Sequence, residues 1–143
     1  MSIKTYPAGD PIRDRAQLAL LERFRAQLHP ALHWRTEVPL PIEFDLRAWD
    51  AVITAAGPSQ WRIKIEAETN ISDGQALERR LALKARDDPE GLLVLLVSDT
   101  VGNRRALRTL RAGTRELLPL DTRQIMLALR AGRQPAGSGI VIL

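Results

Sequence analysis

The sequence predicts an α/β protein in which a mixed β-sheet is flanked by helices. From Trp61 to Glu68 apolar and charged residues alternate, which is typical of a strand with one buried face. The apolar run that starts at Leu92 is typical of a central strand covered on both faces. A helical pattern over residues 75–86 lies between these two segments and can form the crossover between parallel strands.

The amino-terminal part is predicted to hold one helix followed by three extended segments. Asp10 followed by Pro11 is a typical helix start, and His29 with Pro30 ends the helical pattern after Leu28. Prolines at 39 and 41 and a turn at 56–59 separate the extended segments, since proline is rare inside central strands. These segments cover residues 33–38, 42–54 and 61–69.

The carboxyl-terminal part is predicted to add a central strand, an arginine-rich helix, a short strand, a last helix, a Pro/Gly loop and an apolar terminal strand. In this order they cover residues 92–98, 103–115, 117–120, 122–130, 133–138 and 139–143. The 143 residues are expected to form a flexible tail at 1–10 and one domain at 11–143. The terminal strand could join two copies in a homodimer or simply close an edge of the sheet.

Composition excludes several classes of site. The chain has no cysteine, which excludes disulfides, thiolate nucleophiles and cysteine-bound zinc. Its net charge is +4, and of its 21 basic residues only Lys4, Lys64 and Lys84 are lysine. Arginine suits phosphate geometry, so this bias mildly favours nucleic acid, although a coding preference explains it equally well.

No segment suggests a membrane or a secretory route. The longest apolar run, residues 92–97, is far shorter than the roughly 20 residues that span a bilayer. Residues 1–10 are polar and do not form a signal peptide. We therefore expect a cytoplasmic protein with no membrane contact.

The alternating strand gives a candidate metal site. Glu66 and Glu68 share a face with Lys64, and Asp50 falls among the apolar positions of the preceding extended segment. A buried carboxylate needs a hydrogen bond, an ion pair or a metal, and hard cations need several oxygen ligands. Asp50, Glu66 and Glu68 are therefore candidate metal ligands. Two alternatives stay open: a bulge that turns Asp50 to solvent, and a solvated strand face neutralised by Arg62 and Lys64.

The helix after this strand adds polar groups. Gln75 and Arg79 are spaced i, i+4 and share one face near the helix start, which is expected to lie beside the acids. Arg80 and Lys84 form a second such pair on a different face, suited to solvent or phosphate contact. A later cationic helix surface is equally compatible with solvation and with phosphate binding; its residues are Arg104, Arg105, Arg108 and Arg111. The sequence contains no Walker loop and no Gly-rich dinucleotide turn.

The element order and the series Asp50, Glu66-Ala67-Glu68 and Gln75 resemble the PD-(D/E)XK, or restriction-endonuclease-like, nuclease superfamily. Residues 47–52, 66–69 and 75–84 are also similar to a group of bacterial proteins in which such a domain often follows a helix-turn-helix DNA-binding domain. We expect no such domain in this chain, where about ten residues precede the first predicted helix. The resemblance covers residues 12–112 and implies an αβββαβ core.

The resemblance also implies roles for individual residues. Asp50 and Glu66 correspond to the acids that bind Mg²⁺ or Mn²⁺, and Gln75 with Arg79 resembles the polar pair that many members place at the site. The position two residues after the second acid is normally a lysine that assists the attacking water, whereas this chain has Glu68. Lys64 or Lys84 could supply the missing lysine.

Two functions follow as hypotheses. The first is a metal-dependent phosphodiesterase acting on DNA, in which Arg79 or Lys84 stabilises charge on the phosphate. The second is an inactive relative that keeps the fold to bind nucleic acid or a regulatory protein partner. Retention of three acids and Gln75 favours the first hypothesis, and the loss of the motif lysine favours the second.

Overall fold

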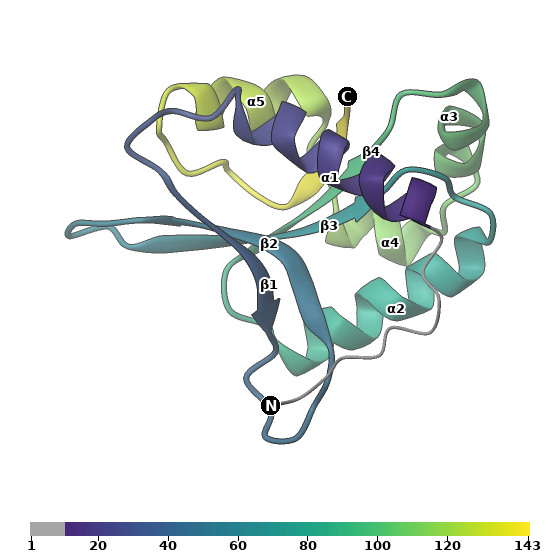
Figure 1. Cartoon of the computed structure of the whole chain (residues 1–143), viewed down its shortest axis with the longest axis horizontal. Helices are drawn as coiled ribbons and strands as arrows, with labels where there is room; N and C mark the ends of the chain where they lie inside the picture. Colours follow the sequence, from purple (N-terminus) through teal and green to yellow (C-terminus); the bar gives the residue numbers. More distant parts are fainter. Residues whose placement is uncertain (1–10) are drawn as a thin grey trace.

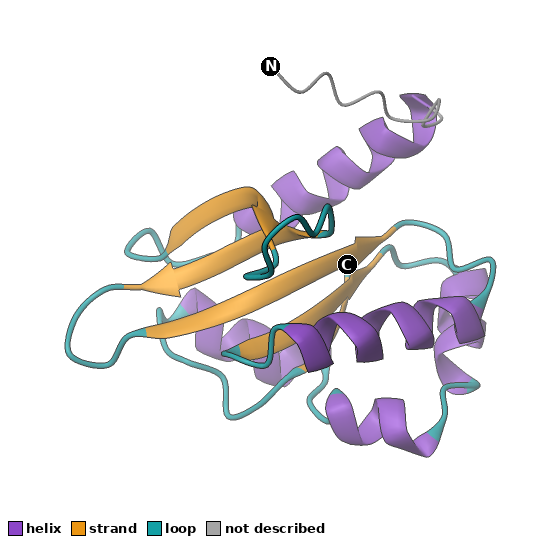
Figure 2. Cartoon of the chain, turned by 90° about the horizontal axis from the view of Figure 1, so that it is seen from below, coloured by secondary structure: helices purple, strands orange, loops and turns teal. Residues whose placement is uncertain are grey.

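The computed structural model of the chain describes residues 11–143, so the predicted tail at 1–10 lies outside the described residues. Its centre is a five-stranded mixed sheet in which the strands follow chain order (Figures 1 and 2). The first two pairings are antiparallel and the last two are parallel. The strands are β1 (His33–Pro39), β2 (Ala48–Ala55), β3 (Trp61–Glu68), β4 (Leu92–Val97) and β5 (Gly139–Ile142). The predicted α/β class with a mixed, helix-flanked sheet is confirmed.

Helices cover both faces of this sheet. On one face α1 (Pro11–Arg25) and α5 (Thr122–Arg130) pack over a core that includes Phe24 and Leu129. On the other face α2 (Gly74–Asp87) packs through Leu77 and Leu81 over a second core (Figure 1). Residues of β4 alternate between these two cores, which is why the whole strand is apolar.

The crossover from β3 through α2 to β4 brings the carboxyl ends of two parallel strands together. Glu66 of β3 is opposite Leu95 of β4, and Glu68 is opposite Val97. Beyond these ends α3 (Val101–Arg108) is anchored by the buried Asn103. The Asn103 amide donates to the carbonyls of residues 69 and 98 and accepts from the backbone N–H of residue 71. This clamp holds the loops that follow β3 and β4.

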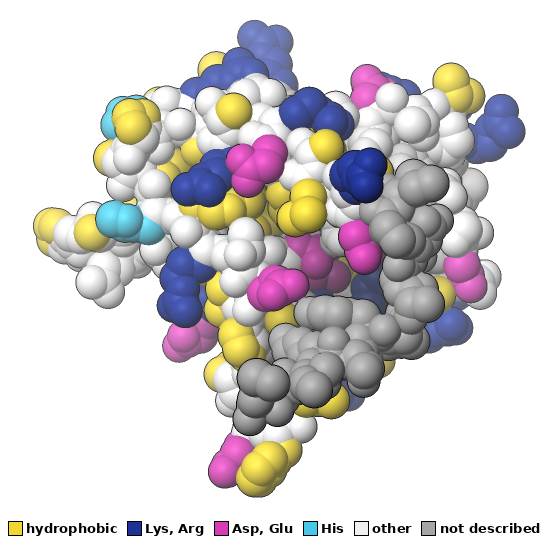
Figure 3. Space-filling model, in the orientation of Figure 1, with side chains coloured by type: hydrophobic (Ala, Val, Ile, Leu, Met, Phe, Trp, Pro, Cys, Tyr) yellow, Lys and Arg dark blue, Asp and Glu magenta, His cyan; other side chains and the backbone are white. Residues whose placement is uncertain are grey.

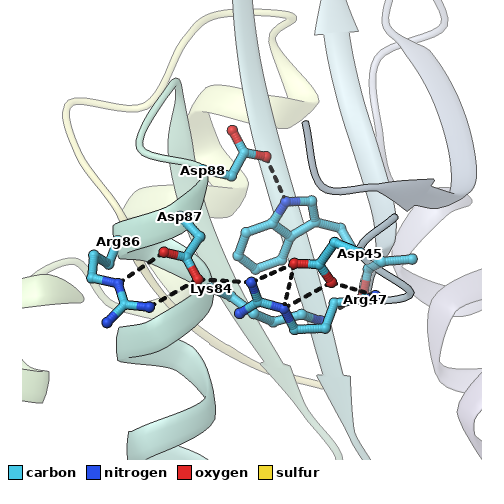
Figure 4. A network of polar contacts seen from close by, with 8 residues as sticks. Asp45, Arg47, Lys84, Arg86, Asp87 and Asp88 are labelled. Atoms are coloured by element: carbon cyan, nitrogen blue, oxygen red, sulfur yellow. Dashed lines mark hydrogen bonds and ion pairs between the residues drawn. The ribbon is translucent and has the colours of Figure 1, made fainter. Parts of the chain in front are cut away.

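The predicted strand over residues 42–54 is wrong in its first half, because residues 42–47 form a loop. Phe44 has a positive φ of 63° and is 93% exposed, and Leu46 is 94% exposed. The Asp45 carboxylate accepts the backbone N–H of Arg47, and the Arg47 guanidinium pairs with both Asp45 and Asp87 (Figure 4). These contacts close a turn that the apolar alternation alone does not reveal.

Three further boundaries differ from the predictions. The first helix ends at Arg25 rather than near residue 28. The arginine-rich helix predicted at 103–115 is divided into α3 and α4 (Ala112–Leu117), with Leu110 buried between them. The predicted strand at 117–120 is reduced to one bridge between Leu120 and Gly139, where a Cβ at Gly139 would meet the Leu120 carbonyl.

No helix within residues 11–143 is long and apolar enough to cross a bilayer.

Candidate functional site

The charged side chains of β3 face α2, as the alternation predicts. Glu66 and Glu68 pair with side chains of α2, and the Lys64 ammonium lies 5.3 Å from the ring centre of Trp49 in the core under the same helix. The helix covers this face, so that Glu66 is only 4% exposed and Lys64 only 2%. The Glu68 side chain is 12% exposed, so the alternative that Glu66 and Glu68 form a solvated strand face is wrong.

Lys84 is the partner of Glu66. Its Nζ lies 2.8 Å from Glu66 Oε1 and donates to the Ala48 carbonyl at 2.6 Å. The same ammonium lies 4.9 Å from the centre of the Trp49 ring, and Lys84 is 6% exposed. A buried ammonium is tolerated here because a carboxylate, a carbonyl and an aromatic face all surround it.

Arg80 lies one turn earlier on α2, at the more open end of the acidic row. Its Nε is 3.5 Å from Glu66 Oε2, and its Nη2 forms an ion pair with Glu68. Two hollows of about 90 and 50 Å³ adjoin Glu68, and the larger one is also lined by Arg80. At roughly 30 Å³ per water, each hollow has room for only one or a few water molecules.

Asp50 approaches the same acids from β2. Pairing of β2 with β3 runs only as far as Ala51 opposite Ile65, and beyond it Asp50 Oδ2 accepts the backbone N–H of Ala67 at 2.8 Å. Burial, and then the negative charge of Glu66, raise the pKa of Asp50 to about 7, against the opposing hydrogen bond from Ala67 and the Lys84 charge. Asp50 is thus a partly buried carboxyl group within electrostatic reach of both glutamates.

The backbone of β2 is irregular at this point. Trp49 and Val52 both belong to the core under α2, whereas Ala51 belongs to the opposite core. Strict alternation would place residues 49 and 52 on opposite faces, so the strand turns its side chains out of phase near Asp50. The pairing of β1 with β2 keeps one register on both sides of Asp50, with Thr36 opposite Ala51 and Val38 opposite Trp49, so no extra residue is inserted here. The predicted alternative, a bulge that turns Asp50 to solvent, is therefore wrong.

A polar network behind the site holds Trp49. The indole Nε1 donates to Asp88 Oδ2 at 2.8 Å, and Arg62 donates to both oxygens of that carboxylate (Figure 4 shows the indole contact). Burial acts to raise the pKa of Asp88, but the bonds from Arg62 and Trp49 hold it below its ordinary value. Lys64 donates to the Asp88 carbonyl, and burial lowers the pKa of Lys64.

Neither Asp88 nor Trp49 is among the site residues that the sequence predicts. The partners of Asp88 come from β2 and β3, so nothing close to it in the sequence indicates its role.

The structure does not bring Gln75 and Arg79 to the acids. Both are exposed, and Arg79 lines a groove between α2 and α4. With about 3.6 residues per turn, burial of Leu77 and Leu81 turns Lys84 toward the sheet and the face of Gln75 and Arg79 away from it. The residues that meet at the site are thus Asp50, Glu66, Glu68, Lys84 and Arg80.

Within residues 11–143 no three His, Cys, Asp or Glu side chains are grouped closely enough to hold a metal ion. The predicted three-carboxylate cage is therefore not formed by these residues, and Glu68 forms an ion pair with Arg80 instead. Comparison of the chain with protein-family models, curated protein sequences and solved structures gave no match.

Proposed function

We propose that this chain is a nuclease-like domain in which Asp50, Glu66 and Lys84 form the reaction centre of a DNA phosphodiesterase that depends on Mg²⁺ or Mn²⁺. One observation carries the proposal. Lys84 Nζ lies 2.8 Å from Glu66, whose charge in turn helps to raise the pKa of Asp50 to about 7. Two acids that repel each other beside a lysine are the groups that metal-assisted phosphodiester hydrolysis uses.

Two carboxylates, those of Asp50 and Glu66, are a suitable set of protein ligands for Mg²⁺. Mg²⁺ is commonly held by one or two carboxylates, with water and phosphate oxygens at its other positions. Asp50 and Glu66 would hold the ion, which when bound lowers the pKa of a coordinated water and neutralises phosphate charge. The raised pKa of Asp50 supports this assignment, because a nearby cation would relieve the repulsion from Glu66.

Lys84 would do the work of the lysine that the resemblance implies at position 68. It reaches the Glu66 carboxylate from α2, and the Ala48 carbonyl and the Trp49 ring fix its ammonium. From this position Nζ would orient the attacking water or stabilise the charge that builds on the phosphate. Arg80 is more exposed than Lys84, and its guanidinium would give up its ion pair with Glu68 to bind a phosphate oxygen.

DNA would approach this centre from the open surface, because the two hollows beside Glu68 hold only a few waters. Exposed Arg105 and Arg108 of α3 are available for backbone contacts beyond the carboxyl ends of β3 and β4. Figure 3 shows acidic side chains gathered near the middle of one face, with Lys and Arg side chains at several places around it.

A plasmid-nicking assay in Mg²⁺ and in Mn²⁺ tests the proposal. Glu66→Gln and Lys84→Met should each reduce nicking at least about a hundredfold, because each removes a group that acts on the reacting atoms. Glu116→Gln is the matched control, since Glu116 is exposed on α4, and it should nick like the wild type. Circular dichroism of each variant checks that it is folded. Nicking that survives Glu66→Gln would contradict the proposal.

A second function is favoured by the ion pairs of the site. Glu66 is already bonded to both Lys84 and Arg80, and Glu68 to Arg80, so the chain neutralises these acids without a metal. This arrangement suits an inactive module that binds nucleic acid or a protein. Absence of nicking by the wild type, together with DNA affinity that falls steeply with salt, would favour this function over the first.

A further inference from the structure

A groove of about 620 Å³ runs between α2 and α4, on a face of α2 other than the one that meets Glu66. Ala82, Ala85 and Leu117 form an apolar floor. Three arginines stand along the groove: Arg79, Arg86 and Arg111. It therefore combines an apolar interior with a basic border.

The basic border is only partly neutralised by nearby carboxylates. Arg79 makes no ion pair with any carboxylate of residues 11–143. Arg86 pairs with Asp87, and Arg111 Nε is 3.9 Å from Glu78. The Glu78 carboxylate is itself used by α4, since it accepts the backbone N–H of Arg111 and the hydroxyl of Thr114. The groove thus keeps an excess of positive charge that complements an acidic ligand.

We infer that this groove is the docking site for an acidic amphipathic helix of a partner protein. An apolar floor requires an occupant with apolar side chains, which a phosphate backbone does not offer. The volume accommodates a few large aliphatic side chains, and carboxylates beside them would meet the arginines. The groove and the proposed reaction centre lie on different sides of α2, because Lys84 and Arg80 point from the other side of the helix toward the acids. Docking at the groove therefore does not depend on the proposed chemistry.

Glycine positions give a matched pair of variants. A Cβ at Gly113 in α4 meets no atom within 4 Å, so Gly113→Leu places a side chain at the groove without a backbone clash. A Cβ at Gly102 in α3 is equally free, and Gly102 does not line the groove. Both variants should melt at or above the wild-type temperature, because leucine favours helix more than glycine does.

The probe is a fluorescein-labelled helical peptide with leucines along one face and glutamates elsewhere, followed by anisotropy. We expect the wild type and Gly102→Leu to bind it equally and Gly113→Leu to bind at least about tenfold more weakly. Arg79→Glu should also weaken binding at least about tenfold, whereas Arg105→Glu on α3 should not. Binding unchanged in Gly113→Leu, or no binding by the wild type, would overturn the inference.

Two further peptides test whether the groove binds apolar side chains or only negative charge. A peptide of the same composition with its leucines scattered should bind at least about tenfold more weakly, and so should an all-glutamate peptide. Equal binding of either would refute an apolar anchor and leave only charge attraction. A DNA duplex whose own binding is lost in Gly113→Leu would instead assign the groove to nucleic acid and overturn the inference.

Discussion

Replacing Asp50 by asparagine tests the electrostatic description of the site without altering its shape. The asparagine side chain keeps an oxygen that can accept the Ala67 N–H but cannot ionise. In the wild type, burial and the Glu66 charge raise the pKa of Asp50 from 3.8 to about 7. The folded protein therefore holds a proton that the unfolded chain has lost between about pH 4 and 7, so this carboxyl makes folding less favourable as pH rises through that range.

The size of the effect follows from the shift. About three pKa units at about 1.4 kcal/mol each give an upper value of about 4 kcal/mol above pH 7. Asp50→Asn should thus equal the wild type near pH 4 and exceed its free energy of unfolding by up to about 4 kcal/mol at pH 8. The difference should grow steadily between these values.

Urea unfolding at several pH values, followed by tryptophan fluorescence, measures this difference. Asp14→Asn is the control, because Asp14 is exposed on α1, and it should match the wild type at every pH. An Asp50→Asn variant that is less stable than the wild type at pH 8 would refute the reasoning. A difference that does not vary with pH would do the same, because it would arise from packing and not from ionisation.

Three further predictions concern stability in urea unfolding at neutral pH. Trp49→Phe removes the indole N–H from the buried Asp88 and should lower the free energy of unfolding by about 1–3 kcal/mol; no change would mean that Arg62 alone satisfies the carboxylate. Lys84→Met should lose about 3–5 kcal/mol, and a double variant with Glu66→Leu should lose less than the two single losses combined; simple additivity would contradict direct pairing. Gly139→Ala should lose at least about 2 kcal/mol through its clash with a backbone carbonyl, and equal stability of this variant and the wild type would show that β5 can shift.

Hydrophobic periodicity predicts most of the strands, because burial of one or both faces of the sheet decides where apolar residues occur along each strand. Strand β3 alternates and faces α2 with its charged residues, while β4 is apolar throughout because both faces are covered. Periodicity fails at residues 42–47, where Phe44 and Leu46 continue the pattern although they are almost fully exposed. The turn there depends on Arg47 reaching Asp87, a contact that no local pattern reveals.

The site residues on α2 could have been predicted better from the sequence. Leu77 and Leu81, spaced i, i+4, are the buried leucines of the helix, and Lys84 follows Leu81 at i+3 on the same side. That phase excludes Gln75 and Arg79 from the sheet side, although the resemblance placed them at the site. The role of Asp88 could not have been found in this way, because its partners lie 39 and 26 residues earlier in the chain.

The charges of the site suggest where an added cation would go. Asp50, Glu66 and Glu68 face Lys84 and Arg80, which leaves one negative charge in excess. Among residues 11–143 Asp50 has no cationic hydrogen-bond partner and accepts only a backbone N–H, so the excess lies on this carboxyl. Burial, and then the negative charge of Glu66, raise the pKa of Asp50 to about 7. A proton and a divalent ion would then compete for the same group. Binding of Mg²⁺, followed by calorimetry in buffers of different ionisation enthalpy, should release close to one proton at pH 6 and almost none at pH 8.5. Equal proton release at both pH values, or Mg²⁺ binding that persists unchanged in Asp50→Asn, would show that the ion binds elsewhere.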